Sequence, residues 1–295
     1  MSDTLNIKQS SLFSQTLILI KHRLSFSVVF SSVCSYLIAF DVFSLTTFLL
    51  LIIGGFFVVG SSNGFNQIIE RRRDALMTRT SSRPLPSGVM TVNQALIICS
   101  FLSLLGLTML YVINFRTAIF GLISMIIYLA LYTPLKPITP LSVFFGAIPG
   151  AIPFMLGWVA VTNRFSIETG ILFMIQFFWQ FPHFWALGWM LDDDYKKAGF
   201  IMLPTGNRDK STALQIILYI IWMMIISVFP YTGLTGDLTL SFGSTIAILI
   251  LGIIMLVLAI NLYNRMDISS ARKLFYSSIL YLTLIQIIYL IDKFL

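Results

Sequence analysis

The chain of 295 residues is 57% hydrophobic and only 11% charged, and its mean hydropathy is +0.90. These values exclude an ordinary soluble globular protein and indicate a polytopic membrane protein surrounded by a lipid bilayer. The net charge is +7, and we expect no nucleic acid partner.

Nine apolar runs are long enough, at about 20 residues each, to cross a bilayer as helices. The segment before them, 1–23, is more polar and weakly amphipathic, so we expect it in the cytoplasm or along the membrane interface. The first run then remains as an anchor rather than a cleaved signal. The expected fold class is all-α, a single integral-membrane domain over residues 1–295, with runs at 24–40, 44–65, 92–113, 117–133, 141–162, 166–190, 212–232, 242–263 and 274–292.

Lysine and arginine are distributed unevenly between the two sides of this arrangement. With the N-terminus inside, all but three of the 19 Lys and Arg residues lie on inner segments, the exceptions being Arg116, Arg164 and Lys293. This bias predicts a cytoplasmic N-terminus in the cell inner membrane and, after nine spans, a C-terminus outside. The two largest polar loops, 66–91 and 191–211, then face the cytoplasm together. Each follows an even-numbered helix, which suggests a degenerate internal duplication with a site between two halves.

The first polar loop opens with three oxygen-bearing side chains spaced four residues apart, Asn66, Glu70 and Asp74. On an α-helix this spacing places them along one face, each about 6 Å from the next. Oxygen ligands in such a row suit Mg²⁺, which prefers carboxylates together with phosphate oxygens. Guanidinium groups bind phosphate bidentately; those nearby are Arg71, Arg79 and Arg83. Arginines just past a membrane helix are also a common topology signal, and the run that starts at Arg71 taken alone fits that explanation.

The middle of the chain offers two further features. Lys136, in the next inner loop, fits either a phosphate contact or a simple positive-inside charge. The helix expected after it is rich in helix breakers, which indicates close helix packing or a broken helix that lines a cavity. These breakers are Gly146, Pro149, Gly150, Pro153 and Gly157.

The second polar loop follows the sequence Trp179-Gln180-Phe181-Pro182-His183-Phe184. A lone His in an apolar helix is often a satisfied core residue, but the preceding proline favours a cavity, and an ionisable group inside the membrane is a functional candidate. Beyond it, Asp192, Asp193 and Asp194 with Lys197 are either a solvated helix end or a second carboxylate group. A second group facing the first would allow a second metal ion.

Together these motifs resemble the UbiA-type membrane prenyltransferases, in particular the branch that acts on haem, over nearly the whole chain. Asn66, Glu70 and Asp74 fall on that family's first acid-rich motif. Gln67 departs from the second acid usual in the wider family, and His183 from the Asp usual in members that act on quinones. The other segments that carry the resemblance are 77–88, 132–136, Gly157-Trp158, 179–187 and 194–204.

The resemblance implies a helical bundle around a central cavity with a polar cap on the cytoplasmic side. It implies farnesyl transfer from farnesyl diphosphate to a vinyl group of haem b, with a hydroxyl from water, and Mg²⁺ as cofactor. The metal ligands would be Asn66, Glu70, Asp74 and the aspartates 192–194, and the diphosphate ligands Arg71, Arg79, Arg83, Lys136 and Lys197. Catalysis would also use His183 and Lys136, the acceptor would contact His183, Trp179 and Tyr195, and partners would include other haem-biosynthesis or terminal-oxidase assembly proteins.

Two other functions are compatible with parts of this sequence. A prenyltransferase that uses a quinone, chlorophyll or other aromatic acceptor would share the ionisation chemistry. A transporter or channel would also have inner loops and broken helices, but it should place ionisable residues near mid-helix. All 12 acidic residues map to loops or helix ends, which favours an enzyme with a site at the membrane surface.

Overall fold

A computed structural model describes residues 11–295, so the first ten residues of the predicted 1–23 segment lie outside the described part. Within residues 11–295 every regular element is a helix. They are α2 (Leu12–Leu19), α3 (His22–Ala39), α4 (Leu45–Asp74), α5 (Val92–Ile113), α6 (Phe115–Ile126), the π-helix η1 (Ile127–Tyr132), α7 (Thr133–Leu135), α8 (Ser142–Thr162), α9 (Ile167–Lys197), α10 (Lys210–Val228), the 3₁₀ helix η2 (Phe229–Thr232), α11 (Phe242–Arg265) and α12 (Ile268–Lys293).

Eight of the described helical segments are long and apolar enough to cross a membrane, and one of these joins α6, η1 and α7. The 31-residue α9 is a further long helix, and its apolar run is interrupted by Gln176, Gln180 and His183. Each of the nine predicted runs therefore falls on a long helical segment. The predicted all-α membrane fold is confirmed.

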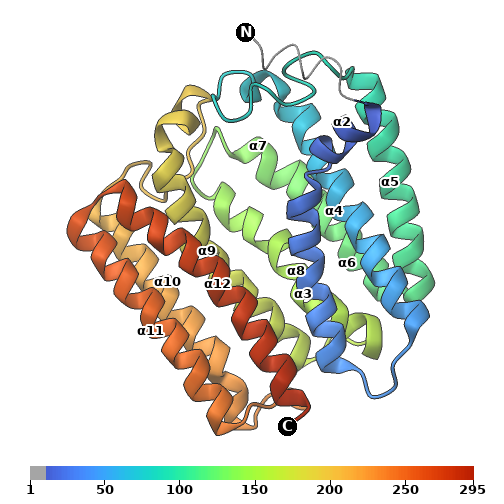
Figure 1. Cartoon of the computed structure of the whole chain (residues 1–295), viewed down its shortest axis with the longest axis vertical. Helices are drawn as coiled ribbons and strands as arrows, with labels where there is room; N and C mark the ends of the chain where they lie inside the picture. The colour runs from blue at the N-terminus through green and yellow to red at the C-terminus, as the bar shows by residue number, and fades with distance from the viewer. Residues whose placement is uncertain (1–10) are drawn as a thin grey trace.

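The long helices run side by side and form one bundle (Figure 1). α3 packs against α4, α8 and α12, and α9 packs against α8, α10 and α12. A buried hydrogen bond of 2.9 Å from Gln286 Nε2 to Ser31 Oγ joins the last long helix to the first. The C-terminus lies at the end of the bundle opposite α2 and the loop that follows α4 (Figure 1).

α8 lies near the centre of the bundle and is the most buried of the eight candidate spans. It remains an α-helix despite Pro149 and Pro153. Pro153 has no N–H to donate to the Pro149 carbonyl, and Ser124 Oγ donates to that carbonyl instead, at 3.3 Å. At Gly157 the helix touches the α3 backbone, because a Cβ there would lie 2.1 Å from the Ser32 carbonyl oxygen. The expected close packing is present, whereas the helix is not broken.

The predicted polar loops 66–91 and 191–211 are partly wrong, because both begin as helix. α4 continues to Asp74 and α9 continues to Lys197, so the loops proper are 75–91 and 198–209. Glu, Gln, Arg and Lys are good helix formers, and they prolong each helix beyond its apolar run. The two extended helices carry the polar residues of both motifs to the same end of the bundle.

Candidate active site at the polar end of the bundle

The predicted row on α4 forms one buried face. Asn66, Glu70 and Asp74 are 2%, 5% and 1% exposed, respectively, whereas Ile69 between them is 50% exposed. The four-residue spacing is the cause, since it turns all three polar side chains to the interior. Polar groups in such a position need partners, and each of the three has a different one.

Two of these partners are cations. Lys136 Nζ lies 2.8 Å from Glu70 Oε1, and Arg83 Nη1 lies 2.8 Å from Asp74 Oδ2. The third contact is neutral: Asn66 Nδ2 donates to Thr133 Oγ1 at 3.0 Å. The partners of the row therefore come from three places: Thr133 from α7, Lys136 from the turn after α7, and Arg83 from loop 75–91.

Lys136 is held on several sides. It is 8% exposed, and its Nζ lies 4.4 Å from the centroid of the Tyr132 ring. Its carbonyl accepts a 2.8 Å hydrogen bond from Ile201 N, in the segment after α9. Burial alone would lower the pKa of Lys136, but the Glu70 carboxylate outweighs it and the pKa is raised. Lys136 is therefore a fixed positive charge.

Loop 75–91 is fastened to the end of α9 by Asp194. The Asp194 carboxylate accepts from the backbone N–H groups of Thr78 at 2.9 Å and Arg79 at 3.3 Å. Lys197 Nζ donates to Thr78 Oγ1 at 3.2 Å. Both predicted acid motifs thus meet at one end of the bundle, with Asp194 holding the loop that carries Arg79 and Arg83.

The neighbouring aspartates point to other partners. Asp192 Oδ2 pairs with Lys196 at 2.7 Å, and Asp193 pairs with Arg208 at 3.1 Å. The described residues contain no group of three or more His, Cys, Asp and Glu side chains placed to share a metal ion. On α4, however, Asp74 Oδ1 is buried without a hydrogen-bond partner, so the row has a free oxygen donor of the kind that Mg²⁺ binds.

The remaining predicted cations differ in position. Arg71 Nη1 donates to the Ile68 carbonyl of its own helix at 2.8 Å, so it is not directed at the row. Arg79 lies over the Tyr195 ring, with Cζ 5.7 Å from the centroid. Tyr195 therefore belongs to the polar end of the site and is buried beside Arg79.

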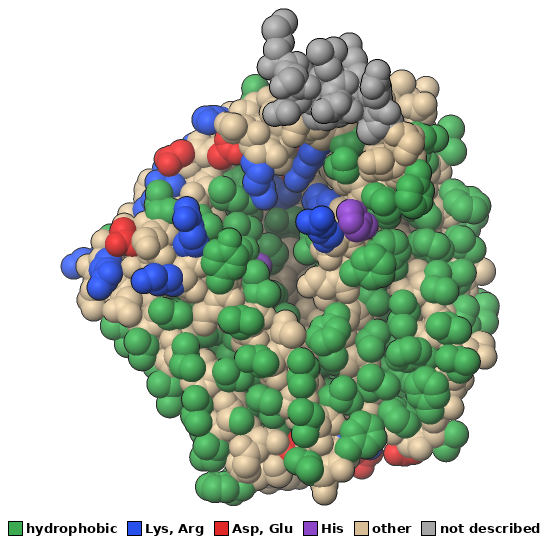
Figure 2. All heavy atoms as spheres, viewed as in Figure 1, with side chains coloured by type: hydrophobic (Ala, Val, Ile, Leu, Met, Phe, Trp, Pro, Cys, Tyr) green, Lys and Arg blue, Asp and Glu red, His purple; other side chains and the backbone are tan. Residues whose placement is uncertain are grey.

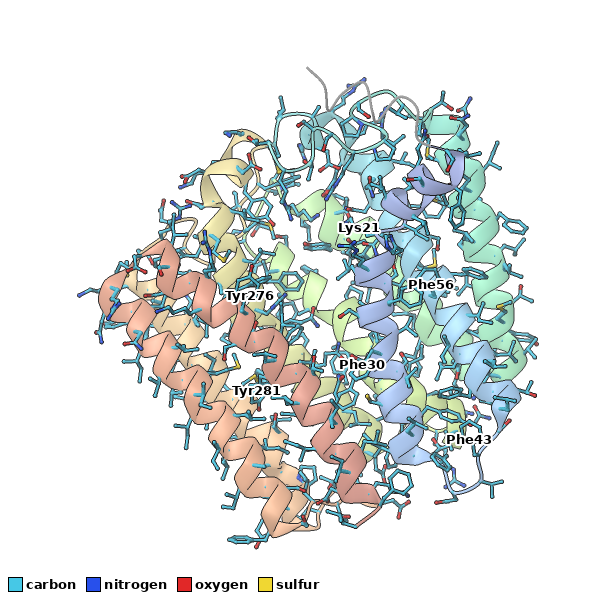
Figure 3. All side chains as sticks on the ribbon, in the orientation of Figure 1. Lys21, Phe30, Phe43, Phe56, Tyr276 and Tyr281 are labelled. Carbon is cyan, nitrogen blue, oxygen red and sulfur yellow. The ribbon has the colours of Figure 1, made fainter. Side chains whose placement is uncertain are left out.

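Lys21 is a cation near the row that the sequence motifs did not identify. It is half-buried and begins α3 in a left-handed conformation with φ 46°. Figure 3 shows it at the upper end of α3. Burial, with the nearby charges of Arg83 and Lys136, lowers the pKa of Lys21 to about 7.

Gln67 fixes the turn that presents Lys21. This fully buried side chain donates through Nε2 to the carbonyls of Ile18 at 3.2 Å and Leu19 at 2.6 Å. The residue that departs from the wider acid motif therefore joins α4 to the turn between α2 and α3. A carboxylate at this position could not donate these hydrogen bonds.

His183 lies eleven residues before Asp194 on α9, in the apolar part of the bundle. Its ring is stacked between Trp179 and Phe275, with centroid distances of 4.5 and 4.8 Å. Its Nδ1 lies 2.8 Å from Ser278 Oγ, and Trp179 Nε1 donates to the Ser278 carbonyl at 2.6 Å. The predicted pair Trp179 and His183 is thus held together by α12.

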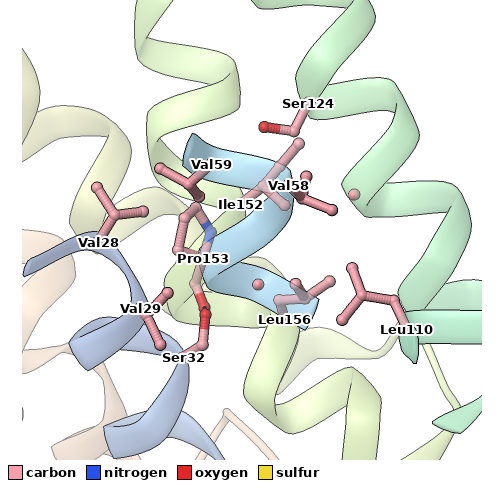
Figure 4. A pocket seen from close by; sticks show the side chains of 12 residues that line it. Val28, Val29, Ser32, Val58, Val59, Leu110, Ser124, Ile152, Pro153 and Leu156 are labelled. Atoms are coloured by element: carbon pink, nitrogen blue, oxygen red, sulfur yellow. Dashed lines mark hydrogen bonds between the residues drawn. The ribbon is translucent and has the colours of Figure 1, made fainter. Parts of the chain in front are cut away.

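A small pocket lies among α3, α4, α6 and α8 (Figure 4). Its walls are mainly aliphatic and include Val58 and Val59 of α4 and Pro153 of α8. Its two hydroxyl groups already donate to backbone carbonyls, Ser32 to Pro153 and Ser124 to Pro149. The cavity is therefore apolar, and it lies about two helical turns below Asn66 along α4.

On the surface, Lys and Arg side chains gather around a hollow toward the polar end, and hydrophobic side chains cover the middle of the molecule (Figure 2). This distribution fits a membrane-embedded body with a charged mouth. The buried row on α4 lies at the same end as this mouth. An anionic group attached to an apolar chain is the kind of molecule that such a mouth suits.

Comparison with known proteins identifies the family. The model of the UbiA prenyltransferase family matches residues 27–284. The chain belongs to this family. The resemblance seen in the motifs is therefore confirmed, and the UbiA fold accounts for the helical bundle and its polar cap.

Two curated relatives of this UbiA chain are called protoheme IX farnesyltransferase. The one from Christiangramia forsetii is 58% identical over 275 residues, covering 93% of this chain and 92% of that protein. The one from Flavobacterium psychrophilum is 55% identical over 288 residues, covering 97% and 96%.

Solved structures agree on the fold. A digeranylgeranylglyceryl phosphate synthase superposes with a TM-score of 0.79 at 22% identity, covering 95% of this chain and 98% of that one. A UbiA homologue from Archaeoglobus fulgidus, bound to GPP and Mg²⁺, superposes with a TM-score of 0.65 at 14% identity, covering 95% and 98%. At these identities the likeness concerns the fold alone.

Proposed function

We propose that the protein transfers the farnesyl group of farnesyl diphosphate to a vinyl group of haem b, giving haem O and diphosphate. The observation that carries this proposal is the buried row Asn66, Glu70 and Asp74, set against Lys136 and Arg83 at the charged mouth of an apolar bundle. The names of the two relatives support farnesyl and haem as the substrates.

The charged residues would bind the diphosphate. Lys136 and Arg83 pair with Glu70 and Asp74, and a cation bound to these carboxylates would release both side chains toward phosphate oxygens. Arg79, Lys197 and Lys21 lie at the same mouth and would neutralise the remaining charge. The farnesyl chain would extend toward the apolar interior of the bundle, on the side where a small pocket with aliphatic walls lies below Asn66.

Magnesium fits the oxygen donors of α4, namely Asn66, Glu70 and Asp74. Asp74 Oδ1 is buried and has no hydrogen-bond partner, and a UbiA homologue of the same fold binds Mg²⁺ with a prenyl diphosphate. When bound, the ion would stabilise the negative charge that develops on the leaving diphosphate.

The chemistry divides into three bond changes. The C1–O bond of farnesyl diphosphate breaks and the electron pair leaves with the diphosphate, which the cations stabilise. The π electrons of the haem vinyl group then form a bond to C1. Water adds to the resulting cation beside the porphyrin and releases a proton, leaving a hydroxyl group. The apolar surroundings of His183 and Trp179 would keep water from the farnesyl cation before it is captured.

The test is product analysis with purified protein. Farnesyl diphosphate, haem b and Mg²⁺ should yield a porphyrin heavier than haem b by one farnesyl group and one hydroxyl group, identified by mass spectrometry. Farnesylation of a quinone or chlorophyll precursor instead of haem would contradict the acceptor assignment. No farnesyl transfer to any acceptor, with substrate movement across vesicles, would favour a transporter.

The metal row is tested by Asp74→Asn, which keeps the size of the side chain and removes its charge. Turnover should fall about 100-fold or more, the usual cost of a lost charge contact in the transition state. Asp237→Asn is the matched control, since Asp237 is exposed in the segment between η2 and α11. Asp74→Asn turnover equal to that of the control, at saturating Mg²⁺ and equal expression, would remove Asp74 from the site.

A further inference from the structure

The two ring nitrogens of His183 have different surroundings, and this difference indicates which of them carries the hydrogen. Nδ1 lies 2.8 Å from Ser278 Oγ. The Ser278 hydroxyl has one hydrogen, and it is directed at the Phe275 carbonyl at 2.6 Å. With its hydrogen on the Phe275 carbonyl, the oxygen can only accept toward His183, and this arrangement assigns the hydrogen to Nδ1.

The imidazole is then neutral, with a lone pair on Nε2. Its close ring neighbours are Trp179, Phe275 and Phe184, and none of them carries a negative charge. A protonated ring without a carboxylate would be costly inside the membrane. Nδ1 is the ring atom that contacts Ser278, and among the described residues none forms a hydrogen bond with Nε2.

The orientation of the ring is also fixed. Trp179 and Phe275 enclose it with interplanar angles of 21° and 26°. Trp179 is itself held by the hydrogen bond from its Nε1 to the Ser278 carbonyl. Ser278 thus contacts Trp179 through its backbone carbonyl and His183 through its hydroxyl.

From this geometry we propose that His183 coordinates the iron of the acceptor haem through Nε2, and that Ser278 is the residue that positions it. A neutral imidazole whose second nitrogen donates a hydrogen bond is the usual form of a metal-binding histidine, and the donated bond fixes the tautomer and strengthens the ligand. The proposal deepens the proposed function, since it rests on haem as the substrate. His183 precedes Asp194 by eleven residues, so about 16 Å along the helix axis separates the proposed iron ligand from the polar end of α9.

The experiment is a haem b titration of the purified full-length protein, monitored by absorption and electron paramagnetic resonance. The wild type should show the signature of imidazole-ligated iron. His183→Ala should lose that signature, and added imidazole should restore it. Binding of a non-hydrolysable farnesyl diphosphate analogue with Mg²⁺, measured on the same samples, should be unchanged and reports correct folding.

Ser278 is tested by a matched set on the same helix. Ser278→Ala should weaken haem binding about 10-fold or more, as expected when the hydrogen bond to a metal ligand is removed. Ser278→Thr keeps the hydroxyl and should restore binding. Ser277→Ala, one residue earlier on α12 and without a hydrogen bond to His183, should bind haem like the wild type.

Several results would overturn the proposal. An imidazole signature that persists in His183→Ala, or a wild-type spectrum without nitrogen ligation, would show that His183 does not bind iron. Equal haem affinity in Ser278→Ala and Ser277→Ala would remove the positioning role. Product formation by a wild type that lacks the signature would leave the proposed function intact, whereas ligation without product would leave the iron ligand intact and contradict the function.

Discussion

Lys21 illustrates what a single residue contributes to the mouth of the site. Its pKa of about 7 lies well below the ordinary 10.5 because partial burial disfavours the charged form and Arg83 and Lys136 are near. Glu70 and Asp74 act in the opposite direction but do not compensate. Between pH 6 and pH 8 Lys21 therefore changes from mostly charged to mostly neutral.

We expect this titration to appear in substrate binding. If the charged form of Lys21 binds diphosphate, raising the pH from 6 to 8 should weaken binding of a farnesyl diphosphate analogue about 10-fold through this residue. Lys21→Arg keeps its charge throughout and should lack that component, while the titration of the diphosphate itself remains common to both proteins. Calorimetric titration of the two proteins at several pH values measures the difference. Parallel pH profiles would place Lys21 away from the diphosphate.

The sequence allowed part of this site to be predicted. The spacing of Asn66, Glu70 and Asp74 identifies a shared helix face because helical geometry is local. The position of Lys21 near this row could not be predicted in the same way. It depends on a left-handed turn before α3 and on hydrogen bonds to that turn from Gln67, 46 residues later. Ser278 is equally inconspicuous, because a serine in an apolar helix has no pattern that points to His183.

At the scale of the elements, the predicted boundaries were good where the end of an apolar run coincides with a cap. Thr91 and Gln94 form a capping box, and α5 begins at Val92 as expected. The ends of α4 and α9 were predicted too early, because charged residues continue each helix beyond its apolar run. The π-helix η1 was not predicted either: its last turn lets the Thr133 N–H bond to the Tyr128 carbonyl, and Thr133 then receives the hydrogen bond from Asn66.

The packing of α8 on α3 leaves no room for a side chain at Gly157. A Cβ at position 157 would meet two backbone atoms of α3, Ser32 O at 2.1 Å and Tyr36 N at 2.4 Å. Because backbone cannot turn aside like a side chain, Gly157→Ala should separate the helices and cost about 1–3 kcal/mol or more. Thermal unfolding in detergent, followed by size-exclusion chromatography, measures this loss of stability.

Gly170→Ala is the matched control on α9. A Cβ at position 170 meets no atom within 4 Å, and alanine is the better helix former by up to about 1 kcal/mol. This variant should therefore be as stable as the wild type or slightly more stable. Equal midpoints for Gly157→Ala and Gly170→Ala would mean that α3 and α8 are not in backbone contact in the membrane.

In the whole molecule, loops 75–91 and 198–209 lie on the same side of the bundle. Asp194 at the end of α9 binds the Thr78 and Arg79 backbone, so loops 75–91 and 198–209 cannot lie across the membrane from each other. The charge distribution predicts the absolute orientation, because all but three of the 19 Lys and Arg residues belong to segments expected on the cytoplasmic side.

Topology reporters test both statements at once. Fusions of a reporter that is active only in the cytoplasm should give signal after Arg83 and after Arg208, and fusions of one active only outside should give signal after Asn163 and after Leu295. Opposite results at Arg83 and Arg208 would contradict the contact made by Asp194. Agreement at these two positions with all four signals reversed would instead preserve the site and place its mouth outside, where a diphosphate made in the cytoplasm could not reach it without crossing the membrane.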